Sequence, residues 1–329
     1  KLTFEAKAPN KVFDVIIISV GTPLEIKSKS PNLNHLDNVL NDVGELISEN
    51  CLVCLRSTVP VGITRSKVLP ILEKKSGLKA GEGFFLTFAP ERTVEGKALE
   101  ELRSNPQVIG GISDEGTERA ATFFHKVTPT VISVTSVEIA EFAKIMDNTY
   151  RDVCFSFANE MALISENLKL DINEVIKASN IHYPRNNIPV PSPGVGGACL
   201  SKDPHILIDL SLKVGYNPKL IKEARNINEK YPALIVDRIS KEVELLNKDI
   251  NDMKILIAGF SFKGNPETAD LRDSTTLWLL KNMQNRYSPM ITGYDPIVED
   301  EEIENLGVQA VSLENAFENI NVLIIANNH

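Results

Sequence analysis

The chain has 329 residues, of which 43% are hydrophobic and 24% are charged, a balance typical of globular proteins with more than one core. Its formal net charge of -9 argues against a nucleic-acid-binding protein, which would need a basic face. No apolar run approaches the roughly 20 residues that span a bilayer, and no signal peptide is recognisable, so we expect no membrane partner. Four cysteines are too few for a disulfide scaffold and favour a cytoplasmic protein.

Residues 1–132 alternate short apolar strands with amphipathic helices. The predicted strands are Val15–Val20, Cys51–Ser57, Phe84–Phe88 and Gln107–Gly110. The predicted helices are His35–Ile47, Ser66–Lys75 and Glu115–His125. Continuous apolar strands that alternate with helices indicate a parallel sheet covered on both faces, so this segment is predicted to be a doubly wound α/β domain.

Residues 133–250 change to a helical pattern. A long helix is predicted over Val137–Leu168, which contains no Pro or Gly, and a second over Ile172–Ser179 with Asp171 as its N-cap. After a loop rich in Pro and Gly, helical periodicity returns over Pro204–Leu246. This segment is predicted to be a helical central domain.

Residues 251–329 return to the α/β pattern. Strands are predicted at Ile255–Gly259, Met290–Tyr294 and Val322–Ala326, and a helix at Ser274–Asn282. The predicted fold class is therefore α/β, with two Rossmann-like doubly wound domains joined by a helical central domain, a layout that binds nucleotides at its strand ends. No strand–Gly-x-Gly-x-x-Gly–helix unit precedes the first strand, and the chain stops on a strand, so we expect both α/β domains to be truncated.

The segment Pro191–Asp203, PSPGVGGACLSKD, carries the strongest chemical signal. Gly194, Gly196 and Gly197 permit positive φ angles and a close approach of the backbone to a ligand. Cys199 follows where a helix is predicted to start, and a helix N-terminus favours a reactive thiolate. A buried cysteine beside a tight turn is the alternative that this pattern leaves open.

The long predicted helix carries a second candidate group. Glu141, Lys144 and Asn148 share one face of this helix. A lysine and an amide one turn apart can both donate to a developing oxyanion, so this pair is a candidate for transition-state stabilisation. A solvated polar stripe is the alternative.

Polar residues also follow three of the predicted strands. Thr58 comes directly after the second strand, and Glu91 and Glu95 follow the third, at the edge where α/β proteins bind ligands. A pair of acids there can act as a general base or position a water molecule. Lys263 and Arg272 lie in the loop before the last predicted helix and suit a phosphate or pyrophosphate. Solvated charged loops are the alternative at each position.

Cys51 and Cys54 form a Cys-x-x-Cys pair, but residues three apart on a strand point to opposite faces. We therefore expect core cysteines rather than a redox or metal site. No cluster of His, Cys and acidic residues has the spacing of a zinc site, so no metal is predicted.

Six motifs, in this order along nearly the whole chain, resemble those of the UDP-glucose/GDP-mannose dehydrogenase family. They are VGTP at Val20–Pro23, STVPVG at Ser57–Gly62, PER…EG at Pro90–Gly96, Glu-x-x-Lys-x-x-x-Asn at Glu141–Asn148, GVGGxCxxKDP at Gly194–Pro204 and FK…DxRDS at Phe262–Ser274. Any one could arise by chance, whereas six in register form a specific signal. The resemblance implies NAD as cofactor, a UDP-sugar as substrate, and a homodimer or higher homo-oligomer formed through the central domain.

The resemblance also implies roles for individual residues. The catalytic residues would be Cys199 as nucleophile, Lys144 and Asn148 as oxyanion donors, Asp203 as the acid that organises the catalytic water, and Thr58 and Glu91 near that water. Contacts to the cofactor are expected from Thr22, Pro23, Thr58, Glu95 and Arg272. Contacts to the substrate are expected from Glu91, Arg92, Thr93, Val94, Lys144, Asn148, Arg185, Gly196, Gly197, Phe262 and Lys263, with Arg185 reaching the site of the partner subunit.

The implied reaction is a two-step, four-electron oxidation of the C6 hydroxymethyl group of a UDP-sugar to a carboxylate. Cys199 would form a thiohemiacetal with the intermediate aldehyde and then a thioester, which water hydrolyses. The absent glycine fingerprint normally supplies the turn that binds the cofactor pyrophosphate, which leaves an inactive nucleotide-sugar-binding dimer as an alternative of another class.

Two segments resemble the branch of the family that acts on UDP-N-acetyl-D-mannosamine. They are Arg92 with the following VEGKALEELRSNPQVIGG, and YPRNNI at Tyr183–Ile188. UDP-N-acetylglucosamine and UDP-glucose are the alternative substrates. A β-hydroxyacid or 6-phosphogluconate-type dehydrogenase shares the α/β-plus-helical layout but needs neither the cysteine nor a third domain.

Overall fold

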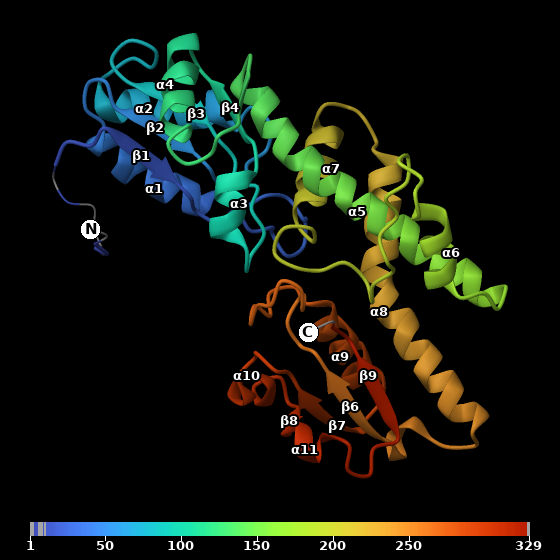
Figure 1. Ribbon diagram of the computed structural model, residues 1–329. Coiled ribbons are helices and arrows are strands. Elements are labelled where there is room, and N and C mark those ends of the chain that lie inside the picture. Colours follow the sequence, from blue (N-terminus) through green and yellow to red (C-terminus); the bar gives the residue numbers. More distant parts are fainter. Residues whose placement is uncertain (1–2, 6–8, 10, 328–329) are drawn as a thin grey trace. The chain divides into compact units, whose positions relative to one another are not determined.

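A computed structural model describes residues 3–5, 9 and 11–327 of the chain (Figure 1). The chain forms two compact units, Lys1–Asp147 with His205–Tyr216, and Asn148–Pro204 with Asn217–His329. The predicted boundaries of the three domains, after residues 132 and 250, do not coincide with the division into these two units. The three-domain division stays a prediction. None of the helices in the described residues combines the length and the apolar character that crossing a bilayer requires.

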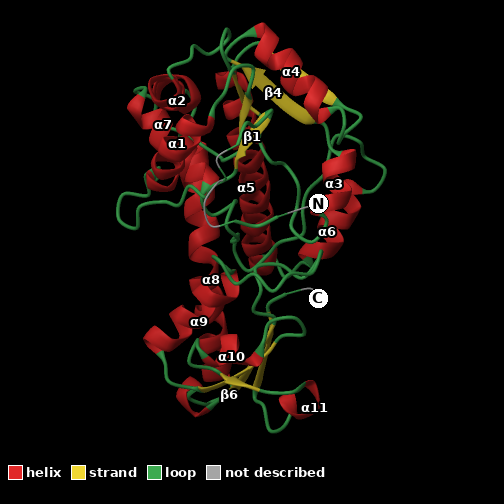
Figure 2. Cartoon of the chain, turned by 90° about the vertical axis from the view of Figure 1, so that its left-hand side faces the viewer, coloured by secondary structure: helices red, strands yellow, loops and turns green. Residues whose placement is uncertain are grey.

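The helices and strands follow the predicted order (Figure 2). The strands are β1 (Val15–Ile18), β2 (Leu52–Leu55), β3 (Phe85–Phe88), β4 (Gln107–Gly111), β5 (Val131–Val134), β6 (Lys254–Ala258), β7 (Met290–Tyr294), β8 (Gln309–Ala310) and β9 (Val322–Ile325). The helices are α1 (Asn34–Leu46), α2 (Leu69–Ser76), α3 (Ala98–Ser104), α4 (Asp114–Phe124), α5 (Val137–Asn167), α6 (Ile172–Asn180), α7 (Asp203–Lys213), α8 (Lys219–Leu245), α9 (Thr275–Arg286), α10 (Asp300–Glu304) and α11 (Leu313–Ala316), with the short helical turns η1 (Thr64–Val68) and η2 (Ile250–Asp252). The sequence pattern does not predict α3, β5, β8, α10 and α11, which are short. Asp171 caps α6 as predicted, since its side chain accepts a hydrogen bond from the backbone N–H of Asn173.

The first unit holds a five-stranded sheet in the order β1-β2-β3-β4-β5. Its pairs are parallel except β3 and β4, which are antiparallel, with Thr87 opposite Gly111. The prediction of a wholly parallel sheet is wrong at this pair. A parallel connection needs a crossover element packed on the sheet, whereas α3, the helix between these two strands, has no buried residue.

Helices cover both faces of this sheet. One core joins the strands to Leu40 of α1, Leu72 of α2 and Val137 of α5. The other packs Phe124 of α4 against Phe85 of β3. Burial on both faces explains why the strands are continuously apolar.

Cys51 and Cys54 serve the cores on opposite sides of this sheet. Both thiols are buried, and burial raises the pKa of each to about 11. An un-ionised buried thiol is a weak nucleophile and a weak metal ligand. The prediction that this pair serves the core is confirmed.

The second unit contains a four-stranded parallel sheet in the order β8-β7-β6-β9. Its core packs Val236 of α8 and Leu280 of α9 against Ile257 of β6. The α/β class and the helical central region are therefore as predicted. Because β6 is flanked by strands on both sides, the loop after it starts at an interior position of the carboxyl edge, where α/β sheets bind ligands.

The start of α5 is tied to η1 by an ion pair. Arg65 donates from Nε to Glu138 Oε1 at 2.6 Å and from Nη2 to Oε2 at 3.3 Å. This hydrogen bonding lowers the pKa of Glu138 to about 2, against a smaller opposite effect of burial.

The substitution Glu138→Gln is expected to lower the free energy of unfolding at neutral pH by less than about 1 kcal/mol, because both side chains are partly exposed. A carboxyl group whose pKa falls on folding stabilises the protein above the pKa of the unfolded chain and loses this effect as the pH falls through the folded value. The difference between the two proteins in urea unfolding should therefore shrink as the pH falls from about 4.5 toward about 2. A difference that is independent of pH would refute the assignment of this ion pair.

Candidate active site

The cysteine loop, residues 191–203, is bound at both ends by helix α5. Four buried polar residues recur along one face of α5 and form a polar stripe, composed of Asn148, Asp152, Ser156 and Asn159. Asn159 Oδ1 accepts a hydrogen bond from the backbone N–H of Ser192 at 2.9 Å. Asn148 Nδ2 donates to Asp203 Oδ2 at 2.6 Å. The polar stripe thus holds the first and last parts of the cysteine loop.

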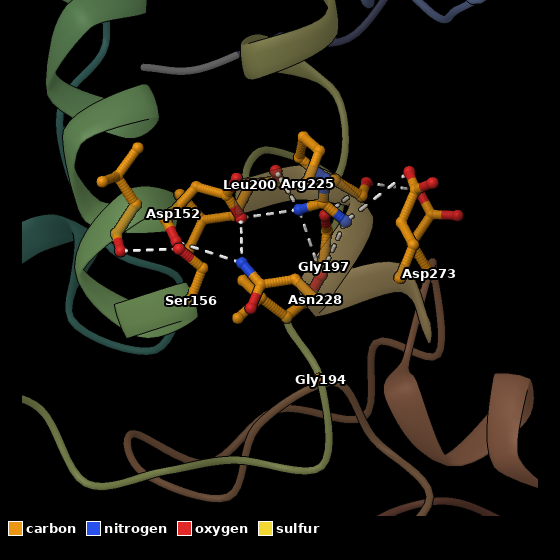
Figure 3. A network of polar contacts seen from close by, with 12 residues as sticks. Asp152, Ser156, Gly194, Gly197, Leu200, Arg225, Asn228 and Asp273 are labelled. Atoms are coloured by element: carbon orange, nitrogen blue, oxygen red, sulfur yellow. Dashed lines mark hydrogen bonds and ion pairs between the residues drawn. The ribbon is translucent and has the colours of Figure 1, made fainter. Parts of the chain in front are cut away.

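A buried ion pair lies beneath the middle of this loop (Figure 3). Arg225 of α8 donates from Nη1 to Asp152 Oδ1 at 2.6 Å, and both side chains are almost fully buried. The same guanidinium donates to the carbonyl oxygen of Leu200 at 3.0 Å and to that of Val195 at 3.3 Å. These bonds fix the backbone on both sides of the cysteine.

Two glycines of the loop, Gly196 and Gly197, lie against the segment between β6 and α9. A Cβ added at Gly196 would lie 2.0 Å from the carbonyl oxygen of Asp273, and one added at Gly197 would lie 2.7 Å from the ring of Phe262. The backbone N–H of Gly197 donates to the same carbonyl at 2.9 Å, and its φ of +83° lies in the left-handed region that favours glycine. The absence of a side chain at these two positions therefore permits close packing on Asp273 and Phe262, and their approach to a ligand stays a prediction.

The substitution Gly196→Ala is expected to lower the free energy of unfolding by about 1–3 kcal/mol, because the obstructing atom is a backbone carbonyl that cannot rotate away. Gly21→Ala is the matched control, since a Cβ at Gly21 would meet no atom within 4 Å. Urea unfolding of the two variants measures the difference. Equal unfolding midpoints would contradict the close contact at Gly196.

Cys199 is exposed, and its carbonyl accepts hydrogen bonds from the backbone N–H groups of Lys202 at 3.1 Å and Asp203 at 2.9 Å. Helix α7 begins at Asp203, so the prediction that a helix starts at the cysteine is wrong by four residues. The reason is Pro204, because a proline is tolerated in the first turn of a helix and not further inside it. The cysteine therefore lies in a turn just ahead of the helix.

Both oxygens of the buried Asp203 carboxylate are engaged. Lys202 Nζ donates to Oδ1 at 2.6 Å, and Asn148 Nδ2 donates to Oδ2. The first residue of a helix is also where the dipole favours negative charge. The structure brings together two residues predicted for the chemical step, Asn148 and Asp203, and adds Lys202 to them.

The loop between β6 and α9 carries the predicted phosphate-binding residues. Lys263 Nζ lies 5.3 Å from the centre of the Phe262 ring. Arg272 is mostly exposed and donates from Nε and Nη2 to the carboxylate of Asp270, the Nη2 bond measuring 2.5 Å. The predicted residues of this loop thus lie in the same unit as the cysteine loop.

Asp295, at the end of β7, shapes the turn after β6. Its carboxylate accepts hydrogen bonds from the backbone N–H groups of Phe260 at 2.6 Å and Ser261 at 3.2 Å. Burial raises the pKa of Asp295, but four backbone hydrogen bonds outweigh this effect and hold the pKa below its ordinary value. The carboxylate acts as a fixed support for the loop.

In the other unit, the ends of β1 and β2 meet at the carboxyl edge of the sheet. The buried Thr22 donates from Oγ1 to the carbonyl oxygen of Thr58 at 2.6 Å, which brings together two residues predicted to contact the cofactor. Gly21 and Pro23, on either side of Thr22, are exposed, and the space above Gly21 is open. An open glycine at this edge lets a nucleotide approach the backbone closely, so the residues present fit a dinucleotide.

Glu91 organises the loop that contains it. Its carboxylate accepts hydrogen bonds from Arg56 Nη2 at 2.5 Å and from the backbone N–H groups of Arg92 at 2.8 Å and Thr93 at 2.9 Å. Burial raises the pKa of Glu91, but the hydrogen bond and charge of Arg56 outweigh burial, so the pKa is lowered. A carboxylate held in this way is better suited to positioning the loop than to removing a proton.

Residues near Glu91 are also tied to the protein. Arg92 forms an ion pair with Asp147 of α5 at 2.9 Å, and the backbone N–H of Val94 donates to Glu101 Oε2 at 2.7 Å. Glu95 is exposed at the end of this loop.

Two residues predicted to contact the substrate, Lys144 and Arg185, lie in none of the loops described above. Lys144 is half-buried on α5, four residues before Asn148, and the guanidinium of Arg185 lies 4.9 Å from the ring centre of Tyr183. Both stay predictions for contacts to the substrate.

Glu141, on the same predicted face as Lys144 and Asn148, is fully buried. It accepts hydrogen bonds from the backbone N–H of Gly62 at 2.5 Å and from the hydroxyl of Thr64 at 2.6 Å. Burial raises its pKa against these hydrogen bonds. Glu141 therefore supports the loop after β2 and does not form an exposed stripe.

Sequence reasoning did not identify three charged residues that support these loops, Arg56, Asp152 and Arg225. Arg56 directly follows the apolar strand β2, whereas Asp152 and Arg225 lie beside other polar residues of α5 and α8. A charge at the end of an apolar strand is the signal that could have found Arg56, since charged residues are buried only when paired, whereas no local pattern marks Asp152 or Arg225.

Comparison of the sequence with models of known protein families shows the family of this chain. Residues 1–128 match the NAD binding domain of the UDP-glucose/GDP-mannose dehydrogenase family, residues 138–230 its central domain and residues 256–329 its UDP binding domain. The chain belongs to this family of NAD-dependent oxidoreductases, as its motifs predict.

Two similar proteins and one similar solved structure carry the name of a particular dehydrogenase. The UDP-N-acetyl-D-mannosamine dehydrogenase of Pyrococcus horikoshii is 34% identical over 316 residues, which cover 96% of this chain and 71% of the relative. The enzyme of the same name from Methanococcus vannielii is 33% identical and is covered to 69% of its length, with 96% of this chain aligned. The solved structure of the UDP-D-ManNAc dehydrogenase from P. horikoshii superposes with a TM-score of 0.87 at 33% identity, and covers 96% of this chain and 71% of that chain.

Proposed function

We propose that the chain oxidises the C6 hydroxymethyl group of UDP-N-acetyl-D-mannosamine to a carboxylate with NAD, through a covalent intermediate on Cys199. The observation that carries the proposal is the exposed thiol in a turn whose backbone is fixed on both sides by hydrogen bonds from the buried Arg225. Two relatives that are 34% and 33% identical carry the name of this reaction.

Bound NAD supplies a hydride acceptor for each of the two oxidations. Between them, Cys199 Sγ adds to the aldehyde carbon, and the carbonyl electron pair moves to oxygen, which takes up a proton. After the second oxidation the sulfur holds the carbon as a thioester. Water then adds to this carbon, the C–S bond breaks, and a carboxylate and a free thiol remain.

Asp203 is proposed to position the hydrolytic water. Its carboxylate is buried, close in sequence to Cys199, and fixed by Lys202 and Asn148. A fixed carboxylate can accept a hydrogen bond from water as water attacks the thioester. The roles of Thr58 and Glu91 near this water rest on their family motifs, and the contacts of Glu91 favour a supporting role.

Lys144 and Asn148 are proposed to stabilise the oxyanions of the thiohemiacetal and the thioester adduct. Each nitrogen that donates to a developing negative charge lowers the barrier, and a missing donor of this kind costs about 10²–10³ in rate. One N–H of Asn148 already binds Asp203, so the amide couples the two groups.

The UDP moiety is proposed to bind the loop between β6 and α9. Lys263 carries a positive charge in this loop and Phe262 a ring, and residues 256–329 match the UDP binding domain of the family. Of the cofactor contacts, Thr22, Pro23 and Thr58 are proposed at the carboxyl edge of β1 and β2, while Glu95 and Arg272 rest on their motifs.

An assembly through α5 is part of the proposal. Tyr150, Phe157 and Ile164 are at least 48% exposed and recur every seven residues along this helix. An apolar seam of this spacing is typical of helices that pack on a second helix. We therefore propose a homodimer or higher homo-oligomer, to be measured by sedimentation. All four cysteines are free thiols, which supports the proposed cytoplasmic location.

A substrate panel tests the proposal. The protein is incubated with NAD and UDP-N-acetyl-D-mannosamine, UDP-N-acetylglucosamine or UDP-glucose, and NADH absorbance is followed. A kcat/KM that is highest for the mannosamine compound by about 10-fold or more is expected. A higher value for either other sugar would replace the proposed substrate. Sugar binding without NADH from any of the three would favour an inactive nucleotide-sugar-binding protein.

A further inference from the structure

The geometry points to Arg225 as a positioning residue for the nucleophile. We propose that Arg225, held by Asp152, fixes the backbone on both sides of Cys199 and so sets the direction in which the thiol attacks. This inference rests on the proposed function, and its test includes a measurement that does not depend on it.

The first observation is how the guanidinium distributes its hydrogen bonds. Its Nη1 and Nη2 donate to Val195 at 3.3–3.4 Å, four residues before Cys199, and Nη1 donates to Leu200, one residue after it, at 3.0 Å. The peptides between these two carbonyls include the flexible glycine pair. One rigid, planar group therefore spans the segment that carries the thiol (Figure 3).

The second observation is that both charges of the Arg225–Asp152 ion pair are buried, which is unfavourable for stability. Arg225 is 2% exposed and Asp152 is fully buried. Removing two charges from water is costly, and an apolar pair of similar size is often at least as stable. Stability alone is therefore a weak reason for an ion pair at this position, whereas fixing one loop conformation is a sufficient one.

The third observation is that Arg225 itself has little freedom. Asp152 accepts from its Nη1 at 2.6 Å, and Asn228, one turn along α8, donates to Asp152 Oδ1 at 2.8 Å. Asn228 Oδ1 in turn accepts from Asn159 Nδ2 at 3.0 Å. The support thus runs from two helices into the loop, and a change at Arg225 releases the loop without altering the thiol.

The variant Arg225→Lys keeps the positive charge and removes the planar fork. We expect kcat for uronate formation to fall by about 10- to 100-fold, since small displacements of reacting groups have effects of this size. KM for the UDP-sugar should stay within about 3-fold of the parent value, because Arg225 donates to Asp152 and to the cysteine loop and reaches the proposed UDP-binding loop only through the contacts of Gly196 and Gly197. Arg238→Lys on the same helix is the matched control, because Arg238 pairs with Glu166 on the surface.

A low kcat could come from a misplaced thiol or from a general loss of structure. The share of the intermediate aldehyde that escapes instead of binding to Cys199 distinguishes the two. A thiol that points away captures the aldehyde poorly, so part of it should escape and react with added methoxyamine to give an oxime, with fewer than two NADH formed per sugar consumed. A purely structural defect lowers the amount of active protein and leaves the parent ratio unchanged. If Arg225→Lys fails to fold, the double variant Asp152→Asn, Arg225→Met removes both charges and is measured in its place.

Hydrogen exchange of the backbone amides at 194–202 decides the inference without any turnover. We expect exchange to be faster by about 10-fold or more in the Arg225 variant and unchanged in Arg238→Lys. Parent-like exchange together with a parent-like kcat would overturn the positioning role. A parent protein that forms no NADH from any UDP-sugar would overturn the proposed function, and the exchange rates would then decide the role of Arg225 alone.

Discussion

The variant Cys199→Ala is expected to lower the rate of uronate formation by at least about 10³-fold, since loss of a nucleophile removes the covalent route as a whole. The aldehyde produced in the first oxidation would have no sulfur to bind, so NADH formation should stop at no more than one per sugar. The exposed thiol lies in a fixed turn, and alanine preserves the backbone of that turn. UDP-sugar affinity should stay within about 3-fold of the parent value, measured by calorimetry.

Cys154→Ala is the matched control for this experiment. Cys154 is half-buried on α5, and the protein should tolerate its loss with unchanged kcat. If Cys199→Ala still forms two NADH per sugar, the covalent mechanism is wrong, whatever the substrate.

The second large effect is expected from Asp203→Asn, with a fall in kcat of about 10²-fold. Asparagine has the shape of aspartate but lacks its charge, so it orients the hydrolytic water poorly. The two oxidations precede hydrolysis and should be affected less. The thioester on Cys199 should therefore accumulate, visible as a rapid first turnover of NADH and as added mass on the peptide that contains the cysteine.

Asp209→Asn on α7 is the control, since Asp209 forms an ion pair with Lys213 one turn along the same helix. A slow Asp203→Asn variant with no rapid first turnover and no modified peptide would argue against a hydrolytic role. The carboxylate would then be a structural ligand of Lys202 and Asn148.

Local patterns predicted the repeating elements because burial on both faces of a sheet leaves a continuous apolar run. Strands such as β2 and β3 are buried along their whole length, which an apolar run indicates directly. The direction of a strand is not encoded in such a run. Strand β4 runs antiparallel to β3 because helix α3, which connects them, does not pack on the sheet. The sequence of a short charged helix does not show whether it packs on a sheet.

The candidate residues were predictable where the chemistry lies in one segment. Asn148 and Asp203 were identified separately by motif, but the 2.6 Å bond between them joins residues 55 positions apart. Arg225 was missed because its partners, Asp152 of α5 and two backbone carbonyls of the cysteine loop, lie in two segments distant from it in the sequence. Residues that act through another residue carry no motif of their own, and only the fold shows them.

The number of NADH molecules formed per UDP-N-acetyl-D-mannosamine consumed tests the central claim most directly. The proposed mechanism predicts two, together with a uronate product, because Cys199 retains the carbon between the oxidations. One NADH per sugar with a released aldehyde would contradict it, since the reaction would then be a simple alcohol oxidation without a covalent step.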